Sequence, residues 1–306
     1  MLIENNILLA KIESPYGSDP TPTTTSNFLA CHNVRINPTL GYNDTAATDG
    51  SLSPRAGTLG RKYIEVSFDH ELQVNDSVQT TPPCKDILKA CGYAESSGVY
   101  TQRTTSFDSV TIWVYMEDVL QKVSGCRGNV VWNLVAGQPA ILAFTMQGLY
   151  QKPSDSTFPT SWTDSGGAPL VAINQSFDYD TAHPVIENLS FSLNNALSQN
   201  PTMDDAQAHG INEIVITNRM PECSFDAEMP LATSYDYWTV YEAVQQKAVG
   251  YVLSNGTAKC TISLPKVEIT NMVPGDRGGT RTYNITGRPC RTTGDDEISL
   301  TFAAVV

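Results

Sequence analysis

The chain has 306 residues, of which 41% are hydrophobic and 17% are charged, and its formal net charge is −13. This length suits two domains of about 150 residues, and the hydrophobic content excludes wholesale disorder. The acidic balance argues against ordinary nucleic-acid binding, which needs clustered Lys and Arg. The low share of charged residues, with Thr, Ser and Asn on the surface instead, is typical of all-β proteins.

The first 30 residues are predicted to form an arm. A short apolar segment over 7–12 precedes three prolines and a threonine run, a composition typical of an extended, turn-rich tether. The apolar start favours docking on the body or on a neighbour over a frayed tail. We expect no export signal, because Glu4 stands where a secretory signal needs basic residues and the apolar run is too short. No stretch approaches the ~20 apolar residues of a membrane helix.

A first β-rich unit is predicted over 31–150. A strand candidate at 34–36 is followed by 41–60, a long polar stretch without periodicity, and such a loop in a compact domain usually signals function or disorder. In 62–72, apolar and polar residues alternate with a period of two, which predicts a strand. A short helix over 86–92 closes at a glycine. Two hairpins complete the unit: 110–116 with 119–123, and 128–134 with 140–146.

Residues 151–183, punctuated by Pro and Gly, are predicted as a linker, and 184–306 as a second unit. The expected elements of this unit are strands at 188–193, 211–217, 220–229, 259–264, 267–270 and 298–302, a helix at 237–244 and a turn at 274–279.

The second unit repeats the first. Both 67–71 and 224–228 spell Ser-Phe-Asp-x-Glu, a short helix follows each, and a later strand of each unit ends in a glycine, Gly148 or Gly287. The offset between the final hairpins is 275 − 137 = 138 at the turns and 287 − 148 = 139 at the closing glycines. A tandem duplication suits the building block of a symmetric assembly, because an active site needs only one set of groups.

Signatures of catalysis and metal binding are missing from the sequence. It has no G-x-S-x-G elbow, no phosphate-binding glycine loop and no H-E-x-x-H pattern. The four histidines and seven cysteines lack the spacing of a zinc site. We therefore expect no catalytic, cofactor-binding or metal-binding residues and no cofactor. The odd number of cysteines, without an export signal, predicts free thiols in a reducing cytoplasm.

Four segments, in this order, resemble the major tail tube proteins of long-tailed (siphovirus-like) bacteriophages: 8–22, 87–93, 108–112 and 125–130. The resemblance covers the first half closely and the second half by architecture. It implies an all-β fold with short flanking helices, made of two tandem tail-tube β-sandwich or half-barrel domains. Family members form stacked rings that make a hollow tube, with one sheet of every domain facing the lumen.

By this resemblance, the arm and the long loop are assembly elements that contact neighbouring rings. The residues expected to carry these contacts are Tyr42, Asn43, Asp44, Asp49 and Arg55 in the loop, and Ile7, Leu8, Leu9, Ile12 and Tyr16 in the arm. The duplicated type is expected to form homotrimeric rings of pseudo-sixfold order.

The resemblance implies a virion protein rather than an enzyme. It would be made and assembled in the host bacterial cytoplasm, would reside in the virion tail, and would have no membrane contact. Its expected partners are itself and the tape measure, tail terminator and distal tail proteins. Viral DNA would pass through the lumen into the host without specific binding.

Two alternatives belong to other classes. An extracellular-type β-sandwich binding module, such as a lectin-like adhesion domain, would explain the Thr- and Asn-rich surface but fits poorly with the odd cysteines and the absent signal. A hydrolase on a β scaffold has no catalytic constellation to support it.

Overall fold

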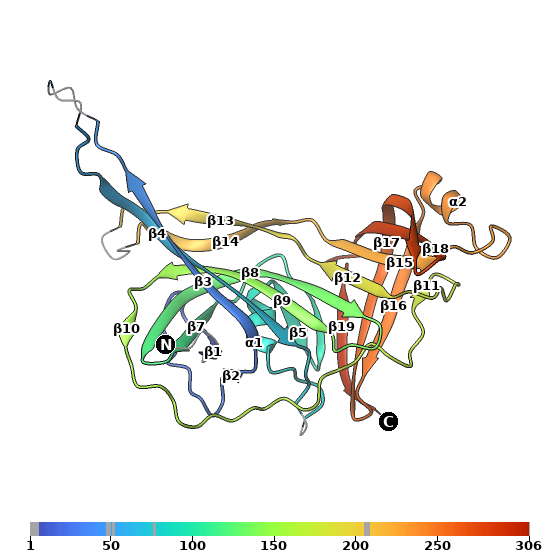
Figure 1. Cartoon of the computed structure of the whole chain (residues 1–306), viewed down its shortest axis with the longest axis horizontal. Coiled ribbons are helices and arrows are strands. Elements are labelled where there is room, and N and C mark those ends of the chain that lie inside the picture. The colour runs from blue at the N-terminus through green and yellow to red at the C-terminus, as the bar shows by residue number, and fades with distance from the viewer. Residues whose placement is uncertain (1–5, 47–49, 51–52, 76–77, 205–208, 306) are drawn as a thin grey trace.

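The computed structural model describes residues 6–46, 50, 53–75, 78–204 and 209–305, and it is built almost entirely of antiparallel strands (Figure 1). The predicted all-β fold with short helices is confirmed. The strands of the first half are β1 (Asn6–Ile12), β2 (Phe28–Leu29), β3 (His32–Asn43), β4 (Thr58–Glu71), β5 (Tyr93–Ser96), β6 (Val99–Gln102), β7 (Val110–Met116), β8 (Val119–Val135), β9 (Ile141–Tyr150) and β10 (Ser154–Asp155). Those of the second half are β11 (Asp178–Tyr179), β12 (Asn188–Ser192), β13 (Asn195–Pro201), β14 (Ile211–Arg219), β15 (Glu222–Glu228), β16 (Gln246–Ser254), β17 (Ala258–Arg277), β18 (Thr280–Pro289) and β19 (Ser299–Ala304).

The first half is a strongly bent sheet with the pairing order β3–β4–β9–β8–β7–β1, in which every neighbour is antiparallel. The helix α1 (Lys85–Ala90) buries Ile87 and Leu88 in its core. The strand near 34–36 and the helix near 86–92 occur where the sequence predicts them. Both predicted hairpins are present, but their strands at 119–123 and 128–134 are one continuous strand, β8.

The second half repeats this pairing order as β12–β15–β18–β17–β16–β11, again antiparallel throughout. The helix α2 (Tyr237–Glu242) occupies the place of α1 in chain order. Asp236 caps its start, because the Asp236 carboxylate accepts hydrogen bonds from the N–H groups of Trp238 at 3.0 Å and Thr239 at 3.2 Å. Six strands in the same order make the two halves equivalent in topology, while the unit boundaries at 31, 150 and 184 remain predictions.

The longest strand of each half bends from one side of its unit to the other. The start of β8 pairs with β7 and its end with β9, and β17 likewise passes from β16 to β18. The two closing glycines lie at these bends. A Cβ at Gly148 would come within 2.4 Å of Val123 Cγ1, and one at Gly287 within 2.5 Å of Val267 Cγ1. Glycine is needed at both positions because the bent strand crosses too closely for any side chain.

The repeated Ser-Phe-Asp-x-Glu motif lies in equivalent strands, β4 and β15, but its two copies do not occupy equivalent positions in these strands. Gly148 pairs with Ile64, four residues before Phe68, whereas Gly287 pairs with Cys223, two residues before Phe225. The shift of two residues keeps both phenylalanines on the buried face, since side chains alternate with a period of two. The repeated motif therefore preserves the core pattern rather than the register.

An antiparallel junction between β8 and β12 joins the sheets of the two halves. The end of β8, from Val131 to Val135, pairs with β12 in addition to β9. Eight strands are thereby continuous in the order β3–β4–β9–β8–β12–β15–β18–β17.

Further contacts fix the halves to each other. The C-terminal strand β19 pairs with β6 of the first half through Leu300 and Tyr100. Residues 151–183, expected as a linker, run along the body, where the N–H of Gly167 donates to Val74 and that of Leu170 donates to Leu72. Leu170 is fully buried. These contacts attach the connection to the body near its middle, while most of residues 152–165 are exposed.

Three predicted boundaries are wrong. The loop expected over 41–60 is shorter, because β3 continues to Asn43 and β4 begins at Thr58. These strand ends are solvated on both faces, so they lack the apolar alternation by which a strand is recognised. The strands expected at 259–264 and 267–270 are one strand, β17, and the turn expected at 274–279 is confined to Gly278 and Gly279.

Candidate assembly surfaces

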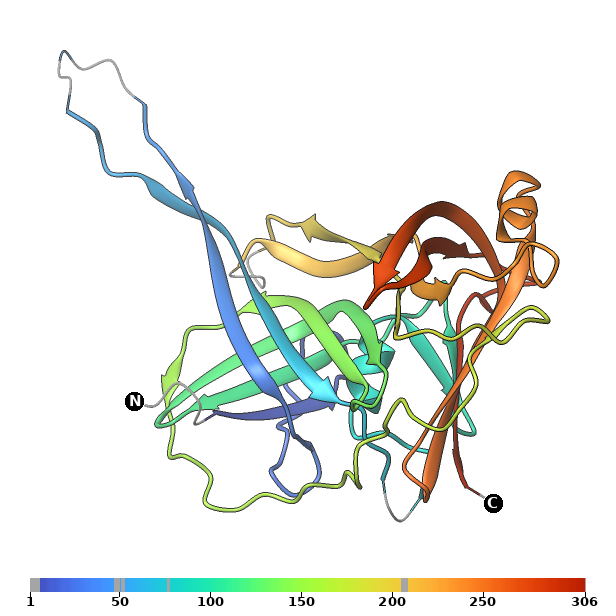
Figure 2. The same cartoon turned by 45° about the vertical axis from the view of Figure 1, so that its right-hand side comes forward.

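The most prominent surface feature is the hairpin of β3 and β4, whose far end projects from the body (Figures 1 and 2). Three large apolar side chains of this hairpin are exposed, with Leu40 at 37%, Tyr42 at 62% and Leu59 at 57%. The body contacts the hairpin at its base, where the N–H of Lys62 donates to the carbonyl of His209 at 3.0 Å.

The expected loop residues lie at the far end of this hairpin. Tyr42 and Asn43 belong to β3, and Asp44 and Arg55 are exposed beyond the strand ends, while Asp49 lies outside the described residues. The Tyr42 hydroxyl accepts a hydrogen bond from the N–H of Gly57 at 2.9 Å, which ties the two sides together. The structure thus brings Tyr42, Asn43, Asp44 and Arg55 into one projecting element.

The arm residues are arranged differently, because β1 is an integral strand of the first half. Seven of its residues pair with β7. Leu8 is buried in the main core, and Ile7 and Leu9 form a smaller buried cluster with Tyr115 and Leu120. Ile12 and Tyr16 are only partly buried. The side chains of Ile7, Leu8 and Leu9 therefore serve the fold of their own chain.

A buried carboxylate anchors the arm beyond β1. Glu13 is 9% exposed. Its Oε2 accepts from the N–H of Gly17 at 2.8 Å and the hydroxyl of Ser109 at 2.6 Å. Its Oε1 accepts from the hydroxyl of Thr111 and the N–H of Gly125, both at 2.6 Å. Four donors on one carboxylate hold the arm against β7 and the bend of β8.

Tyr16 extends this anchor to the second half of the chain. Its hydroxyl donates to the carbonyl of Gly125 at 3.0 Å and accepts from the N–H of Ile214, in β14, at 2.8 Å. The Arg127 guanidinium lies 4.9 Å from the centre of its ring. Burial raises the pKa of Tyr16 well above its usual value, so the phenol remains a neutral donor. Tyr16, expected as a contact residue, thus joins three parts of its own chain.

The eight-stranded sheet has one apolar and one polar face. Side chains such as Phe68, Phe144, Trp132 and Phe225 fill the core side. The register places seven acidic residues and four arginines on the other side: Glu65, Asp69, Glu71, Glu222, Asp226, Glu228 and Glu268, with Arg35, Arg127, Arg277 and Arg288. Neutral Asn, Gln, Ser and Thr occupy most of the remaining positions. This face therefore carries excess negative charge.

Two of these arginines neutralise acids of the second half. Arg277 reaches across β18 to Asp226 at 3.0 Å and to Glu228 at 2.5 Å, and Arg288 lies 3.3 Å from Glu268. Arg127 turns away to donate to the carbonyls of Ile214 at 2.7 Å and Phe107 at 2.9 Å. Glu65, Asp69 and Glu71 on β4 and Glu222 on β15 contribute the rest of the negative charge of this face.

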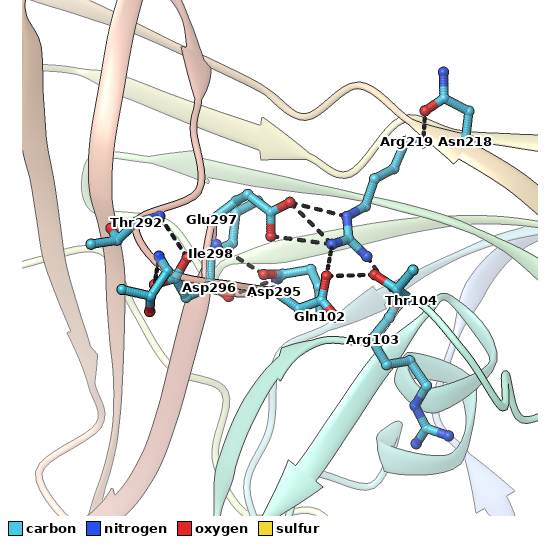
Figure 3. A network of polar contacts seen from close by, with 11 residues as sticks. Gln102, Arg103, Thr104, Asn218, Arg219, Thr292, Asp295, Asp296, Glu297 and Ile298 are labelled. Carbon is cyan, nitrogen blue, oxygen red and sulfur yellow. Dashed lines mark hydrogen bonds and ion pairs between the residues drawn. The ribbon is translucent and has the colours of Figure 1, made fainter.

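Away from the β8–β12 junction, a cluster of polar side chains also joins the two halves (Figure 3). Arg219, at the end of β14, donates to Asp295 at 2.6 Å, to Glu297 at 3.0 Å and to the carbonyl of Arg103 at 2.8 Å. Beside it, the Gln102 side-chain amide donates to the carbonyl of Ile298 and accepts from its N–H. The contacts of this cluster and of Glu13 were not predicted from the sequence, because the residues that they join lie far apart in the chain.

No group of three or more His, Cys, Asp or Glu placed to hold a metal ion occurs within the described ranges. All seven cysteines are free thiols, as the sequence predicts. In the part of the chain that the structure describes, no helix has the length and apolarity to cross a membrane.

A large antiparallel sheet with one polar face, a projecting hairpin and extensive internal anchoring defines a structural protein rather than a catalyst. The comparison with protein families identifies the kind of structural protein. The chain belongs to the phage tail tube protein family, whose model matches residues 4–304. No curated protein matches the chain. It is therefore a structural component of the virion tail and not an enzyme, and nothing favours the lectin-like alternative.

Proposed function

We propose that this chain polymerises as stacked homotrimeric rings into the hollow tail tube of a long-tailed (siphovirus-like) phage, through which genomic DNA is ejected into the host. The observation that carries the proposal is the continuous eight-stranded sheet with one polar face. In this arrangement the polar face lines the lumen and the apolar face packs on the core of each half. Excess carboxylates on that face repel the DNA backbone, so the duplex slides without binding.

The number of strands supports three copies per ring. Eight strands from each of three chains give a wall of 24 strands. At ~4.8 Å spacing and ~40° tilt, such a wall has a circumference of about 150 Å and a diameter of roughly 48 Å between backbones. Side chains reduce the bore to about 40 Å, which is wider than a DNA duplex. Six copies would about double the diameter.

The hairpin of β3 and β4 supplies contacts between rings in this proposal. Its apolar residues Tyr42 and Leu59 are exposed in the single chain and would be covered by a chain of the next ring. The arm makes contacts through Ile12 and Tyr16, which retain accessible surface, because Ile7, Leu8 and Leu9 are used within the chain. The remaining partners are the tape measure protein, which would lie in the lumen, and the tail terminator and distal tail proteins, which would contact the two ends of the tube.

Electron microscopy of the purified protein tests the proposal. We expect long hollow rods, and a reconstruction with three chains per ring and the β4 carboxylates facing the lumen. Monodisperse globules that bind a glycan array would favour the lectin-like module instead, and six complete chains per ring would exclude the trimer.

A deletion tests the role of the hairpin. Replacing residues 41–60 by a short Gly-Ser turn removes Tyr42 and Leu59 together with the projecting tip but leaves the pairing of β3 with β4 at 35–40. We expect a folded protein, judged by circular dichroism and by slow alkylation of its buried cysteines, that forms no tubes. A variant with a Gly-Ser segment of the original length is the control for length alone. Normal tubes from the short variant would contradict the assignment.

A further inference from the structure

The two outer strands of the eight-stranded sheet each leave one edge without a strand partner among the described residues. Within this part of the chain, β3 pairs with β4 alone, and the last part of β17, from Asn271 to Arg277, pairs with β18 alone. Because eight antiparallel strands alternate in direction, β17 runs opposite to β3. The β3 edge of a second copy laid beside β17 therefore continues the antiparallel alternation.

The chain already contains an example of such a junction. Between the halves, the end of β8 pairs with β12. By the repeated pairing order, β8 is the equivalent of β17, and β12 is the equivalent of β3. We infer that β17 of one copy pairs with β3 of the next in the register of the internal β8–β12 junction. The inference rests on the proposed function, since it assumes that copies assemble in rings.

The internal register gives the residues that face each other. Pro38 pairs with Ile64, Phe191 pairs with Cys223, and both Ile64 and Cys223 pair with the closing glycine of their half. Pro38 and Phe191 are therefore equivalent.

The residue of β17 that faces Pro38 is found from the equivalence of β8 and β17. Phe191 faces Trp132 at the internal junction. The valines at the two bends give the offset between β8 and β17, 267 − 123 = 144, so the equivalent of Trp132 is residue 132 + 144 = 276. The neighbouring strands β9 and β18 confirm that Trp132 and Asp276 are equivalent. Trp132 pairs with Leu142 and Asp276 pairs with Arg281, and the difference 281 − 142 = 139 equals the offset between the closing glycines of these two strands. Pro38 of one copy thus faces Asp276 of the next, and when the same register is continued past the end of the internal pairing, Leu40 faces Pro274.

The chemistry of both edges suits controlled pairing with a second copy. Pro38 and Pro274 have no backbone N–H, which limits uncontrolled edge-to-edge pairing of the single chain and leaves these two positions of the proposed junction without a backbone donor. Near the predicted contact, Leu40 is 37% exposed and Val273 is 49% exposed. These apolar side chains become covered when the edges meet.

Disulfide cross-linking in assembled tubes tests the register with four double variants. The pairs Pro38→Cys/Asp276→Cys and Leu40→Cys/Pro274→Cys are in register, with Cα atoms about 4.5–5.5 Å apart. The crossed pairs Pro38→Cys/Pro274→Cys and Leu40→Cys/Asp276→Cys use the same four substitutions at diagonal positions about 7–8 Å apart, which is too far for an unstrained disulfide. Single-cysteine variants control for the native thiols.

We expect a ladder of covalent oligomers from both in-register pairs under mild oxidation, at least about tenfold faster than from the crossed pairs. Equal rates, or faster crossed pairs, in well-formed tubes would overturn the register while leaving tube formation intact. Absence of tubes in the unmodified protein would instead refute the proposed function.

Hydrogen exchange of the unmodified protein provides a second measurement that does not depend on the variants. Among residues 36–41 and 273–277, the amides that point to the free edges should exchange at least about tenfold more slowly in tubes than in the single chain, while Pro38 and Pro274 have no amide hydrogen. Unchanged exchange at both edges in tubes would also overturn the inference.

Discussion

Substitution of Glu13 should release the N-terminal arm. In a Glu13→Gln variant one carboxylate oxygen becomes an NH₂ group, so two of the four donors lose their acceptor. Hydrogen bonds to a charged group contribute about 1.5–3 kcal/mol each. Rotation of the Ser109 or Thr111 hydroxyl recovers part of this, because a hydroxyl can also accept from the new amide. A backbone N–H, of Gly17 or Gly125, has no such alternative, and we expect a net loss of about 2–4 kcal/mol.

Urea unfolding and hydrogen exchange measure this effect. The free energy of unfolding should fall by the stated amount, and the amides of β1 and its partner β7 should show the largest gain in exchange rate. Glu71→Gln removes the same charge at an exposed position on β4 and should change stability by less than about 0.5 kcal/mol. If Glu13→Gln were as mild as this control, the four short contacts would not be what holds the arm.

Two further predictions concern single core positions. Burial lowers the pKa of His70 to about 4 from 6.5, so the folded state binds fewer protons than the unfolded chain between these values, and stability should fall by up to about 3 kcal/mol as pH drops through that window. His70→Gln should remove this part of the pH dependence of urea unfolding; an unchanged slope between pH 6.5 and 4 would argue against it. Gly148→Ala and Gly287→Ala should each cost about 1–3 kcal/mol or more, because the new Cβ overlaps a valine at the bend. Gly294→Ala, where a Cβ would meet nothing within 4 Å, is the control, and comparable losses at all three glycines would refute the close approach.

Many strands with one buried face could be predicted from the sequence, although β16 was missed, and strand ends without a buried face could not. The alternation of Ile64, Val66 and Phe68 with polar neighbours revealed the centre of β4, because every second side chain enters the core. The ends of β3 and β4 beyond the body carry no such signal, since solvent surrounds both faces. The expected loop therefore included Tyr42 and Asn43, which are strand residues.

Contacts that join distant parts of the chain were also beyond sequence reasoning. The pairing of Leu300 with Tyr100, and the hydrogen bonds of Arg219 to Asp295 and Arg103, depend on the three-dimensional arrangement alone. In the sequence, Glu13 looks like an ordinary solvated acid of a loop. Its role as an anchor depends on β7 and the bend of β8, which supply the hydrogen-bond donors beside it.

The tandem duplication has a consequence for assembly. A ring built from single units needs an intermolecular contact at each of six junctions, whereas in the proposed ring of three duplicated chains half of these junctions are the internal β8–β12 pairing. Each internal junction forms with folding, without the loss of translational and rotational freedom that association of separate chains requires. The Arg219 cluster and the β6–β19 pairing hold the two halves at a fixed angle. A fixed angle between the halves presets the curvature of the wall, so the edges of β3 and β17 meet a neighbour already oriented to close the ring.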